Sequence, residues 1–244
     1  MTKNANNIET ALIGCGYWGT NIARSLLAIK SKIFVYDENQ NNAELLKKRY
    51  KNFIIVEKEI YNILNNKKIK NVLLATPPTK NLFLLKKFIS HNKNVFIEKP
   101  GLKNLKEFKK FEKIKNTGVM MFGYIYLFNS NINFIKNFVN NKKNGKLLYL
   151  KFQRQNLGPI RNDVSVSYDL SSHDFSILYY LLGHLPKKIT DTSYSILKKK
   201  LPDISNLSLK YNNIFIDINN SWLNPDKVRR ITIVTSKKML LFDE

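Results

Sequence analysis

The chain has 244 residues, a formal net charge of +23, an apolar fraction of 43% and one cysteine, Cys15. This length allows one large or two small domains with a real hydrophobic core, and the composition excludes a disordered protein. One cysteine excludes an internal disulfide, and no apolar run approaches the ~20 residues of a membrane span. The polar start, residues 1–7, lacks the apolar core of a secretory signal. We therefore expect a cytoplasmic protein that does not bind membranes.

The positive charge could indicate a nucleic-acid binder, but the kind of basic residue argues against it. Of the 41 basic residues, 35 are Lys and only 6 are Arg, and the Lys residues are scattered along the chain. Phosphate and base recognition favours the bidentate Arg fork. Asn is also abundant, with 32 residues, and it shares A/T-rich codons with Lys. A compositional bias explains both, so we predict no nucleic-acid partner.

Strand and helix patterns alternate from the N-terminus to about Gly123. The predicted strands are 11–13, 33–36, 53–56, 72–75, 95–97 and 119–122. The predicted helices are 19–29, 41–50, 60–64, 81–90 and 105–115, and Asn92 or Asn94 is expected to end the fourth of them. Such alternation is typical of an α/β domain with a doubly wound parallel sheet covered on both faces. We assign residues 1–123 to this domain.

The first turn of this domain carries a dinucleotide-binding pattern. An apolar strand runs into Gly14, Gly16 and Gly19, with Tyr17 and Trp18 between the last two. The first Gly permits the tight turn, the second lets backbone approach a pyrophosphate, and the third lets helix and strand pack closely. Asp37 follows the next strand, where an acid binds the ribose hydroxyls of NAD and repels the extra phosphate of NADP. The alternative is an ordinary glycine turn with a solvated Asp37.

Two further turns follow strands of the same predicted sheet. Thr76-Pro77-Pro78 comes after the fourth strand, where a Pro-rich turn can form a stiff wall for a cofactor. Glu98-Lys99-Pro100 comes after the fifth, so Lys99 is expected at the same crevice as a base or a fixed positive charge. The Lys99–Pro100 bond is a candidate cis peptide. A solvated lysine is the alternative, since the chain has many.

The pattern changes after Gly123, and residues 124–244 form a second predicted domain. A helix is expected at 131–141, a long strand at 146–155, a loop holding Gly158-Pro159 and a helix at 172–182. Period-two segments follow at 189–197, 204–211, 214–222 and 228–235. They predict an α+β domain with a largely antiparallel sheet, and an exposed face of that sheet indicates self-association.

The sequence Asp169-Leu170-Ser171-Ser172-His173-Asp174 stands at the expected start of the second domain's long helix. Asp169 lies four residues before His173, close enough to share a helix face with it. A carboxylate that orients an imidazole is the usual way to build a base near neutral pH. The alternative is that Asp169 or Ser171 caps the helix and His173 is a polar first-turn residue.

Together these three motifs, in this order and spacing, resemble the glucose-fructose oxidoreductase / inositol dehydrogenase (Gfo/Idh/MocA) family over the whole chain. The resemblance implies a Rossmann domain followed by an α+β domain with an open, mainly antiparallel sheet. It implies a bound NAD and oxidation of a secondary sugar hydroxyl, with no metal. Lys99 would then lie near the reacting hydroxyl, His173 would accept the proton, and Asp169 would be the partner of His173. The cofactor residues would be Gly14, Gly16, Tyr17, Trp18, Gly19, Asp37, Thr76, Pro77 and Glu98.

A narrower likeness lies in Arg154-x-Asn156-x-Gly158-Pro159-x-Arg161-x-Asp163 and in the segment 221–229. Both resemble the branch that oxidises C3 of UDP-linked N-acetylhexosamines, or their uronic acids, in surface-polysaccharide synthesis. Since a sugar-nucleotide pyrophosphate suits the Arg fork, two of only six arginines here favour substrate contact. The alternative is a loop in which Arg161 pairs with Asp163. The substrate-binding residues would be Lys99, Tyr124, Arg154, Asn156, Arg161 and His173.

The chain also departs from the family pattern. Asn81 and Tyr124 stand where many members carry His. The family usually continues for several dozen residues past the last strand, so we expect a second domain that is incomplete at its C-terminus. Other sugar or inositol dehydrogenases, and NAD-dependent glycosidases, would use the same residues, and an inactive NAD-binding paralogue or sensor is a further alternative. A homodimer or homotetramer is expected.

Overall fold

In the computed structural model, residues 9–29, 32–115, 118–158, 160–197 and 200–244 are described, and the chain divides into two compact units. The first unit ends at Gly123 and the second begins at Tyr124. Each contains one six-stranded sheet. Among the described residues, we find no helix with the length and apolar character needed to cross a membrane.

The first unit alternates strands and helices, as the sequence predicts. Its elements are β1 (Glu9–Ile13), α1 (Tyr17–Ala28), β2 (Ile33–Tyr36), α2 (Gln40–Tyr50), β3 (Ile54–Val56), α3 (Ile60–Asn65), β4 (Ile69–Leu74), α4 (Pro78–Ser90), β5 (Asn94–Ile97), α5 (Leu105–Phe111) and β6 (Met120–Phe122). The strands are all parallel, in the order β3-β2-β1-β4-β5-β6. The predicted doubly wound Rossmann sheet is therefore confirmed.

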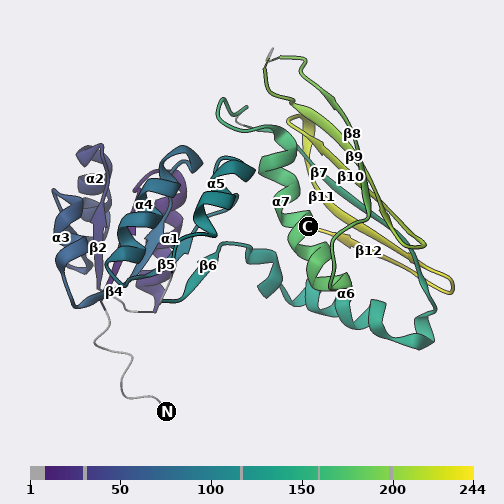
Figure 1. Ribbon diagram of the computed structural model, residues 1–244, viewed down its shortest axis with the longest axis horizontal. Helices are drawn as coiled ribbons and strands as arrows, with labels where there is room; N and C mark the ends of the chain where they lie inside the picture. Colours follow the sequence, from purple (N-terminus) through teal and green to yellow (C-terminus); the bar gives the residue numbers. More distant parts are fainter. Residues whose placement is uncertain (1–8, 30–31, 116–117, 159, 198–199) are drawn as a thin grey trace. The chain divides into compact units, whose positions relative to one another are not determined.

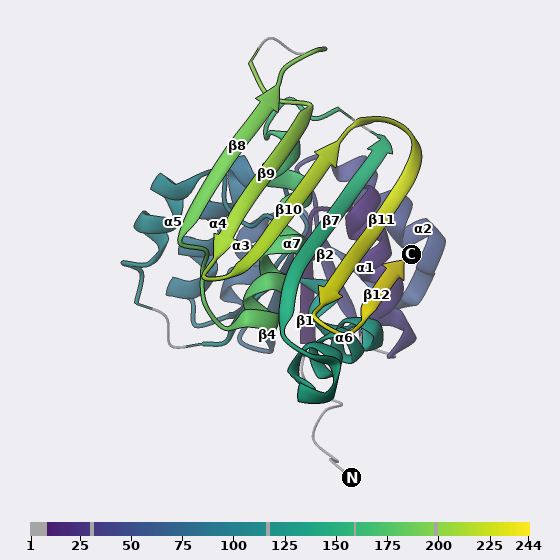
Figure 2. The ribbon, with the colours of Figure 1, turned by 90° about the vertical axis from the view of Figure 1, so that its right-hand side faces the viewer.

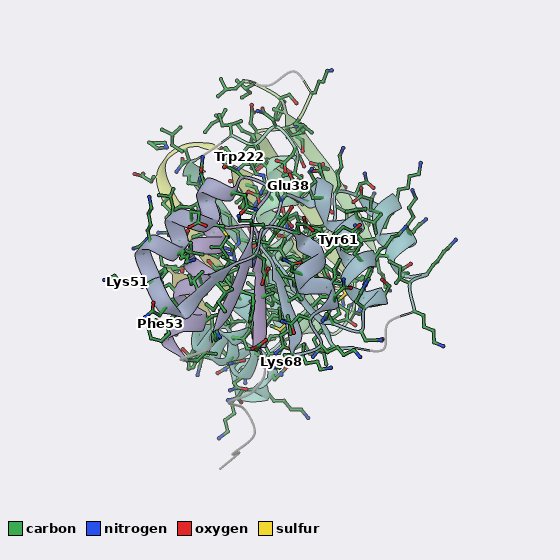
Figure 3. The ribbon with its side chains drawn as sticks, turned by 90° about the vertical axis from the view of Figure 1, so that its left-hand side faces the viewer. Glu38, Lys51, Phe53, Tyr61, Lys68 and Trp222 are labelled. Atoms are coloured by element: carbon green, nitrogen blue, oxygen red, sulfur yellow. The ribbon has the colours of Figure 1, made fainter. Side chains whose placement is uncertain are left out.

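This strand order fixes where a ligand can bind. The chain moves outward from β1 in one direction to β3 and then in the other direction from β4 to β6, so the order reverses between β1 and β4. In open parallel sheets, ligands bind beyond the carboxyl ends of the strands at such a reversal. Glu38, just after β2, marks the carboxyl end of the sheet in Figure 3, and Lys68, just before β4, marks the opposite end.

The core of this unit follows from the alternation of side chains along β1. Leu12 is fully buried on one face with Ala23 of α1 and Leu46 of α2. Ile13 is buried on the other face, where Leu85 and Phe88 of α4 pack. Successive strand residues point to opposite faces, so an apolar run buried on both sides is what a covered parallel sheet needs.

Three predicted boundaries in this unit are wrong by several residues. α4 begins three residues early, at Pro78, because proline is well suited to the first helical position. β4 begins at Ile69 because its polar Asn71 is paired by the amide of Asn94, 3.0 Å away. α5 ends at Phe111, where the chain turns and the Ile114 N–H donates to the Phe111 carbonyl.

The second unit is a mixed sheet with helices on one face. Its elements are η3 (Ile125–Phe128), α6 (Ser130–Asn140), β7 (Leu147–Leu157), α7 (Val166–Leu182), β8 (Lys188–Tyr194), β9 (Ile204–Tyr211), β10 (Ile214–Ser221), β11 (Leu223–Thr235) and β12 (Met239–Asp243). The strand order is β12-β11-β7-β10-β9-β8, and Figure 2 shows these strands side by side. Among the described strands of this second sheet, only the β7–β10 pair is parallel, so the prediction of a mainly antiparallel sheet is confirmed.

Helices α6 and α7 lie against one face of this sheet (Figure 1). Their buried side chains, Ile135 and Leu178 among them, pack on Phe152 of β7 and Ile218 of β10. The other face has no described helix of this unit over it, and it carries polar pairs such as the Tyr149 hydroxyl donating to Asp217 at 2.9 Å. The expected homo-oligomer stays a prediction.

The largest error in the second unit concerns α7, which begins at Val166 instead of Ser172. Ser165 is the N-cap residue, and its side chain accepts a hydrogen bond from the Tyr168 N–H. The extra turns are stabilised by packing of Val166 and Leu170 on Trp222. Asp169 therefore lies inside the helix and does not cap it.

Two strand boundaries differ for local reasons. β8 ends at Tyr194 because the Asp203 carboxylate accepts the N–H groups of Ile196 and Leu197 and curls the chain. β11 begins at Leu223, and its Pro225 falls in a register shift where no ladder hydrogen bond is needed. Pro159 of the predicted loop lies outside the described residues.

Candidate active site

The glycine turn between β1 and α1 has the shape of a phosphate cradle. Gly14 has φ +94°, and a Cβ there would lie 2.6 Å from the Ala75 carbonyl oxygen. A Cβ on Gly19 would collide with the Gly14 carbonyl oxygen, so helix and turn are in direct contact. A Cβ on Gly16 would meet nothing within 4 Å. The fold therefore requires glycine at positions 14 and 19. Gly16 instead leaves open space, where a pyrophosphate could approach the backbone closely.

The start of α1 offers donors to that space. Gly16 is the N-cap residue and provides no side chain to the first turn. Helix N-termini present N–H groups and a positive dipole end, and they are ready anion sites. Tyr17 and Trp18 follow at once, with 86% and 42% of their surfaces exposed. These two predicted cofactor residues thus lie beside the turn.

Asp37 is fixed at the edge of the same turn. Its Oδ2 accepts the Cys15 N–H at 2.6 Å, and its Oδ1 accepts the Asn39 N–H at 2.8 Å. A cavity of about 450 Å³ opens here. Its lining includes Gly14, Gly16, Asp37, Thr76 and Pro77, all predicted cofactor residues. A carboxylate held in an apolar-walled cavity next to a phosphate cradle fits the adenosine half of NAD.

The sequence reasoning missed other parts of this cavity. Glu38 and Lys80 both line it, and they form an exposed ion pair, with Nζ and Oε1 3.2 Å apart. Phe83 also lines it and is 60% exposed. Lys80 and Phe83 are three residues apart and so share one face of α4, directly after the Thr76-Pro77 turn. The three-residue spacing after the Thr76-Pro77 turn could have indicated from the sequence that Lys80 and Phe83 line the cavity.

Asn81 ties two of the predicted motifs together. It is 1% exposed, its Oδ1 accepts the Thr76 hydroxyl at 2.5 Å, and its Nδ2 donates to the Gly101 carbonyl at 2.5 Å. The turn after β4 and the turn after β5 are thereby held by one amide. The sequence showed Asn81 only as a departure from a family pattern.

Glu98 and Lys99 leave β5 at the carboxyl end of the sheet. Burial raises the pKa of the Glu98 carboxyl. Two hydrogen bonds to this carboxyl, one from the Trp18 side chain and one from the Lys99 backbone N–H, partly offset the rise in pKa. The Lys99–Pro100 peptide is cis, as the sequence suggested. Within the first unit, Lys99 therefore follows the strand next to β4 and lies at the same sheet edge as the glycine turn.

In the second unit, His173 lies on α7 and is 9% exposed. Its ring meets two tyrosines edge-on: Tyr126 at 4.9 Å between centroids with a 67° angle, and Tyr124 at 6.5 Å with 80°. Burial raises the pKa of both phenols. Neutral phenols therefore surround the imidazole at ordinary pH.

Asp169 lies one turn before His173 on α7 and is also 9% exposed. Its Oδ1 lies 3.3 Å from Arg161 Nη1. Arg161 also binds Asp163 through two hydrogen bonds, of 2.9 and 2.6 Å. The salt-bridged loop that the sequence left as an alternative is therefore present. The partnership of Asp169 with His173 and the substrate contact of Arg161 stay predictions.

Arg154 on β7 is 4% exposed. Its Nε lies 2.5 Å from Oδ1 of Asp174, which is fully buried on α7. Asn156, two residues on, accepts a hydrogen bond from Arg229 Nη2 at 2.7 Å. Substrate contacts for Arg154 and Asn156 stay predictions, and in the structure Asp174 already binds the Arg154 guanidinium. The described residues contain no group of three or more His, Cys, Asp or Glu that could hold a metal ion.

Comparison with known proteins agrees with this geometry. Residues 8–123 match the GFO_IDH_MocA family model, described as "Oxidoreductase family, NAD-binding Rossmann fold". A scyllo-inositol 2-dehydrogenase (NAD(+)) of Bacillus subtilis (strain 168) is 28% identical over 192 residues, or 73% of this chain. The match covers 55% of that protein, so this chain spans about half the length of the curated relative.

Solved structures resemble the chain over nearly its full length. GenD2 from gentamicin A biosynthesis, solved in complex with NAD, has a TM-score of 0.87 at 15% identity, covering 99% of this chain and 74% of its own. UDP-N-acetylglucosamine 3-dehydrogenase GnnA from Acidithiobacillus ferrooxidans has a TM-score of 0.84 at 20% identity, covering 97% and 76%. At these identities the likeness is one of fold. The family match covers residues 8–123 and shows that this part of the chain is similar to the NAD-binding Rossmann domain of the Gfo/Idh/MocA oxidoreductases.

Proposed function

We propose that the protein is an NAD-dependent dehydrogenase that oxidises a secondary hydroxyl, at C3, of a UDP-linked N-acetyl amino sugar or its uronic acid. The glycine cradle, the Asp37 cavity and the Lys99 turn all lie at the carboxyl edge of one parallel sheet. A cofactor-binding edge that also presents a lysine suits alcohol oxidation better than cofactor storage.

The proposed chemistry divides the work among a few residues. Bound NAD would supply the acceptor for the hydride that leaves the carbon bearing the hydroxyl. Backbone at Gly14 and Gly16 would hold the pyrophosphate, and Asp37 the ribose hydroxyls. His173 would take the hydroxyl proton, with Asp169 orienting it. Lys99 would hold the substrate oxygen and stabilise its developing charge.

The remaining cofactor and substrate contacts are proposed from the motif resemblance. Tyr17, Trp18, Thr76, Pro77 and Glu98 would complete the cofactor site. The sugar nucleotide would be held by Lys99, Tyr124, Arg154, Asn156, Arg161 and His173. The fold likeness to GnnA, a UDP-N-acetylglucosamine 3-dehydrogenase, is consistent with this substrate class. A role in polysaccharide synthesis is proposed from the motif resemblance. We also propose self-association as a dimer or tetramer.

A second substrate class has its own support. The Bacillus subtilis relative is an inositol dehydrogenase, and it is more similar in sequence than the two solved structures described above. An inositol ring also presents a secondary hydroxyl flanked by others, so the same roles for Lys99 and His173 would apply. The two classes differ in the phosphates, which only a sugar nucleotide presents to arginines.

The test is a single-turnover assay with enzyme near stoichiometric to NAD, so that bound NADH is still seen. UDP-N-acetylglucosamine, its uronic acid and myo-inositol are offered in parallel, and absorbance of NADH is followed. Lys99→Met should abolish the signal, whereas Lys103→Met, an exposed lysine of the same loop, should leave it intact. His173→Gln is compared with His184→Gln, an exposed histidine beyond α7.

The outcomes separate the candidates. A signal with the UDP sugars alone supports the proposed function, and a signal with inositol alone supports the second class. Stabilisation by NAD without turnover of any of the three would favour an NAD-binding paralogue or sensor. Equal loss in Lys99→Met and Lys103→Met would contradict the role given to Lys99.

A further inference from the structure

Three side chains of the second unit form a stack that ends on His173. The Arg154 guanidinium carbon lies 4.2 Å from the centroid of the Tyr126 ring. The Tyr126 ring in turn meets the His173 ring at 4.9 Å and 67°. Arg154 comes from β7, Tyr126 from η3 and His173 from α7, so three separate elements supply the stack. We infer that Tyr126 is a positioning residue for His173 and that Arg154 fixes Tyr126.

Arg154 is held by a buried ion pair with Asp174. Its Nε bonds to Asp174 at 2.5 Å, with 4% and 0% of the two side chains exposed. Asp174 directly follows His173 on α7, so the ion pair anchors the histidine's own helix to β7. Buried ion pairs often stabilise no more than apolar residues of equal size, because desolvation offsets their attraction. Specific placement of the guanidinium is therefore a better account of this pair than stability.

Tyr126 is held at two places. Its face is covered by Arg154, and its hydroxyl donates to Glu244 Oε2 at 2.5 Å. A ring held both at its face and at its tip has little freedom to rotate. Guanidinium–aromatic contacts of this length are attractive, and more so when they are desolvated as here. Tyr126 thus presents a fixed ring to its other neighbour.

His173 packs edge-on against the Tyr126 ring. An edge-to-face contact with a fixed ring favours a narrow range of imidazole orientations. A general base must hold its nitrogen within hydrogen-bond reach of the proton it removes, and small misplacement costs rate steeply. This catalytic consequence rests on the proposed function, but the positioning itself does not. It also gives Arg154 a role that needs no direct contact with substrate.

The experiment first examines the free protein. The imidazole Cε1–H resonance of His173 is identified by its loss in His173→Gln. Tyr126→Leu removes the ring and should shift this resonance. Tyr126→Phe keeps the ring and its contact with Arg154 but loses the bond to Glu244, so it should move the resonance much less. Tyr179→Leu, an exposed tyrosine on α7, is the matched control and should leave it unmoved. Arg154→Lys keeps the charge for Asp174 but removes the planar group, and should shift the resonance in the direction of Tyr126→Leu.

The kinetic readout follows on the same variants. Tyr126→Leu should lower kcat by roughly 10²-fold with KM changed less than about threefold, and Tyr126→Phe should restore most of kcat. Tyr126→Leu also removes a ring current, which shifts the resonance by itself, so Arg154→Lys is the deciding variant. A His173 resonance that stays unmoved in Arg154→Lys overturns the inference, whatever the activity. If the wild-type protein forms no NADH, the proposed function is contradicted. The resonance shifts then still test whether Tyr126 and Arg154 position His173. Should Tyr126→Leu not fold, Arg154→Lys alone carries the test.

Discussion

The two units build their parts of the proposed site by different means. In the first unit the decisive features are backbone features: a left-handed Gly14, a Gly19 in contact with the turn, and open space at Gly16. In the second unit they are side-chain features: the Arg154–Asp174 ion pair and the rings around His173. The glycine turn is specified by residues that are close in sequence. The side-chain contacts near His173 depend on residues that only the fold brings together.

This difference predicts different responses to mutation. A site made of backbone should tolerate change at most side chains but fail at one or two glycines. A site made of buried charges should be sensitive to the loss of one partner and insensitive to the loss of both.

Arg154→Met should lower the free energy of unfolding by about 3–5 kcal/mol, because it leaves the fully buried Asp174 carboxylate without its cation. The double variant Arg154→Met, Asp174→Leu should recover most of that loss, since it removes both charges. Denaturant melts of the two variants and the wild type measure this. Equal destabilisation in single and double variants would show that the second unit does not depend on the pair.

Cys15 provides a chemical test of the glycine turn. Burial, and then the charge of Asp37, raise the pKa of the Cys15 thiol to about 12 from the usual 9.0. Reaction with a thiolate-specific reagent at pH 8 should thus be about 10³-fold slower in the native than in the denatured protein. The folded pKa lies above the unfolded one, so the thiol's contribution to stability is present below pH 9 and is lost as the pH rises toward 12. Comparable rates in both states would contradict a packed turn.

Two alanine substitutions in this turn should behave in opposite ways. Gly19→Ala should cost about 3 kcal/mol of stability, because its Cβ meets the Gly14 backbone and nothing flexible can give way. Gly16→Ala should leave stability within about 0.5 kcal/mol of wild type but weaken NAD binding, since its Cβ enters the open space. Thermal melts with and without NAD separate the two effects. Equal behaviour of both variants would contradict the division of roles.

Asp37→Ala should weaken NAD binding by roughly tenfold to a hundredfold, the usual worth of hydrogen bonds to a charged group. Glu44→Ala, an exposed carboxylate on α2, is the matched control and should have no effect. Calorimetric titration of NAD measures both. An unchanged affinity in Asp37→Ala would remove Asp37 from the cofactor site.

The same contrast decides how much could be predicted from sequence. β2 and β9 match their predicted ranges, because each is a short apolar or alternating run between clear breaks. The glycine cradle and Asp37 were readable for the same reason, since their spacing is local. α7 was predicted six residues too short because its first turns are polar and depend on packing with Trp222. No pattern in the chain indicates that Trp222 lies there.

The parts of the candidate site that the sequence missed follow this rule. Asn81 joins Thr76 to Gly101, and Asp174 joins α7 to β7, each by contacts between distant segments. In the sequence, Asp174 was only the residue after His173, and Arg154 was interpreted as a substrate residue. The Arg154–Asp174 pair forms because the fold packs α7 against β7. Side-chain partnerships of this kind are set by tertiary structure and not by spacing.

The most direct test of the account is whether Lys99 and His173 serve one chemical step. Single-turnover rates of NADH formation would be measured for the wild type, Lys99→Met, His173→Gln and the double variant. Residues that act as a unit give strongly non-additive losses. We predict that the double variant is no more than a few-fold slower than the slower single variant. Losses that multiply, or a single variant as fast as wild type, would contradict a shared role in alcohol oxidation.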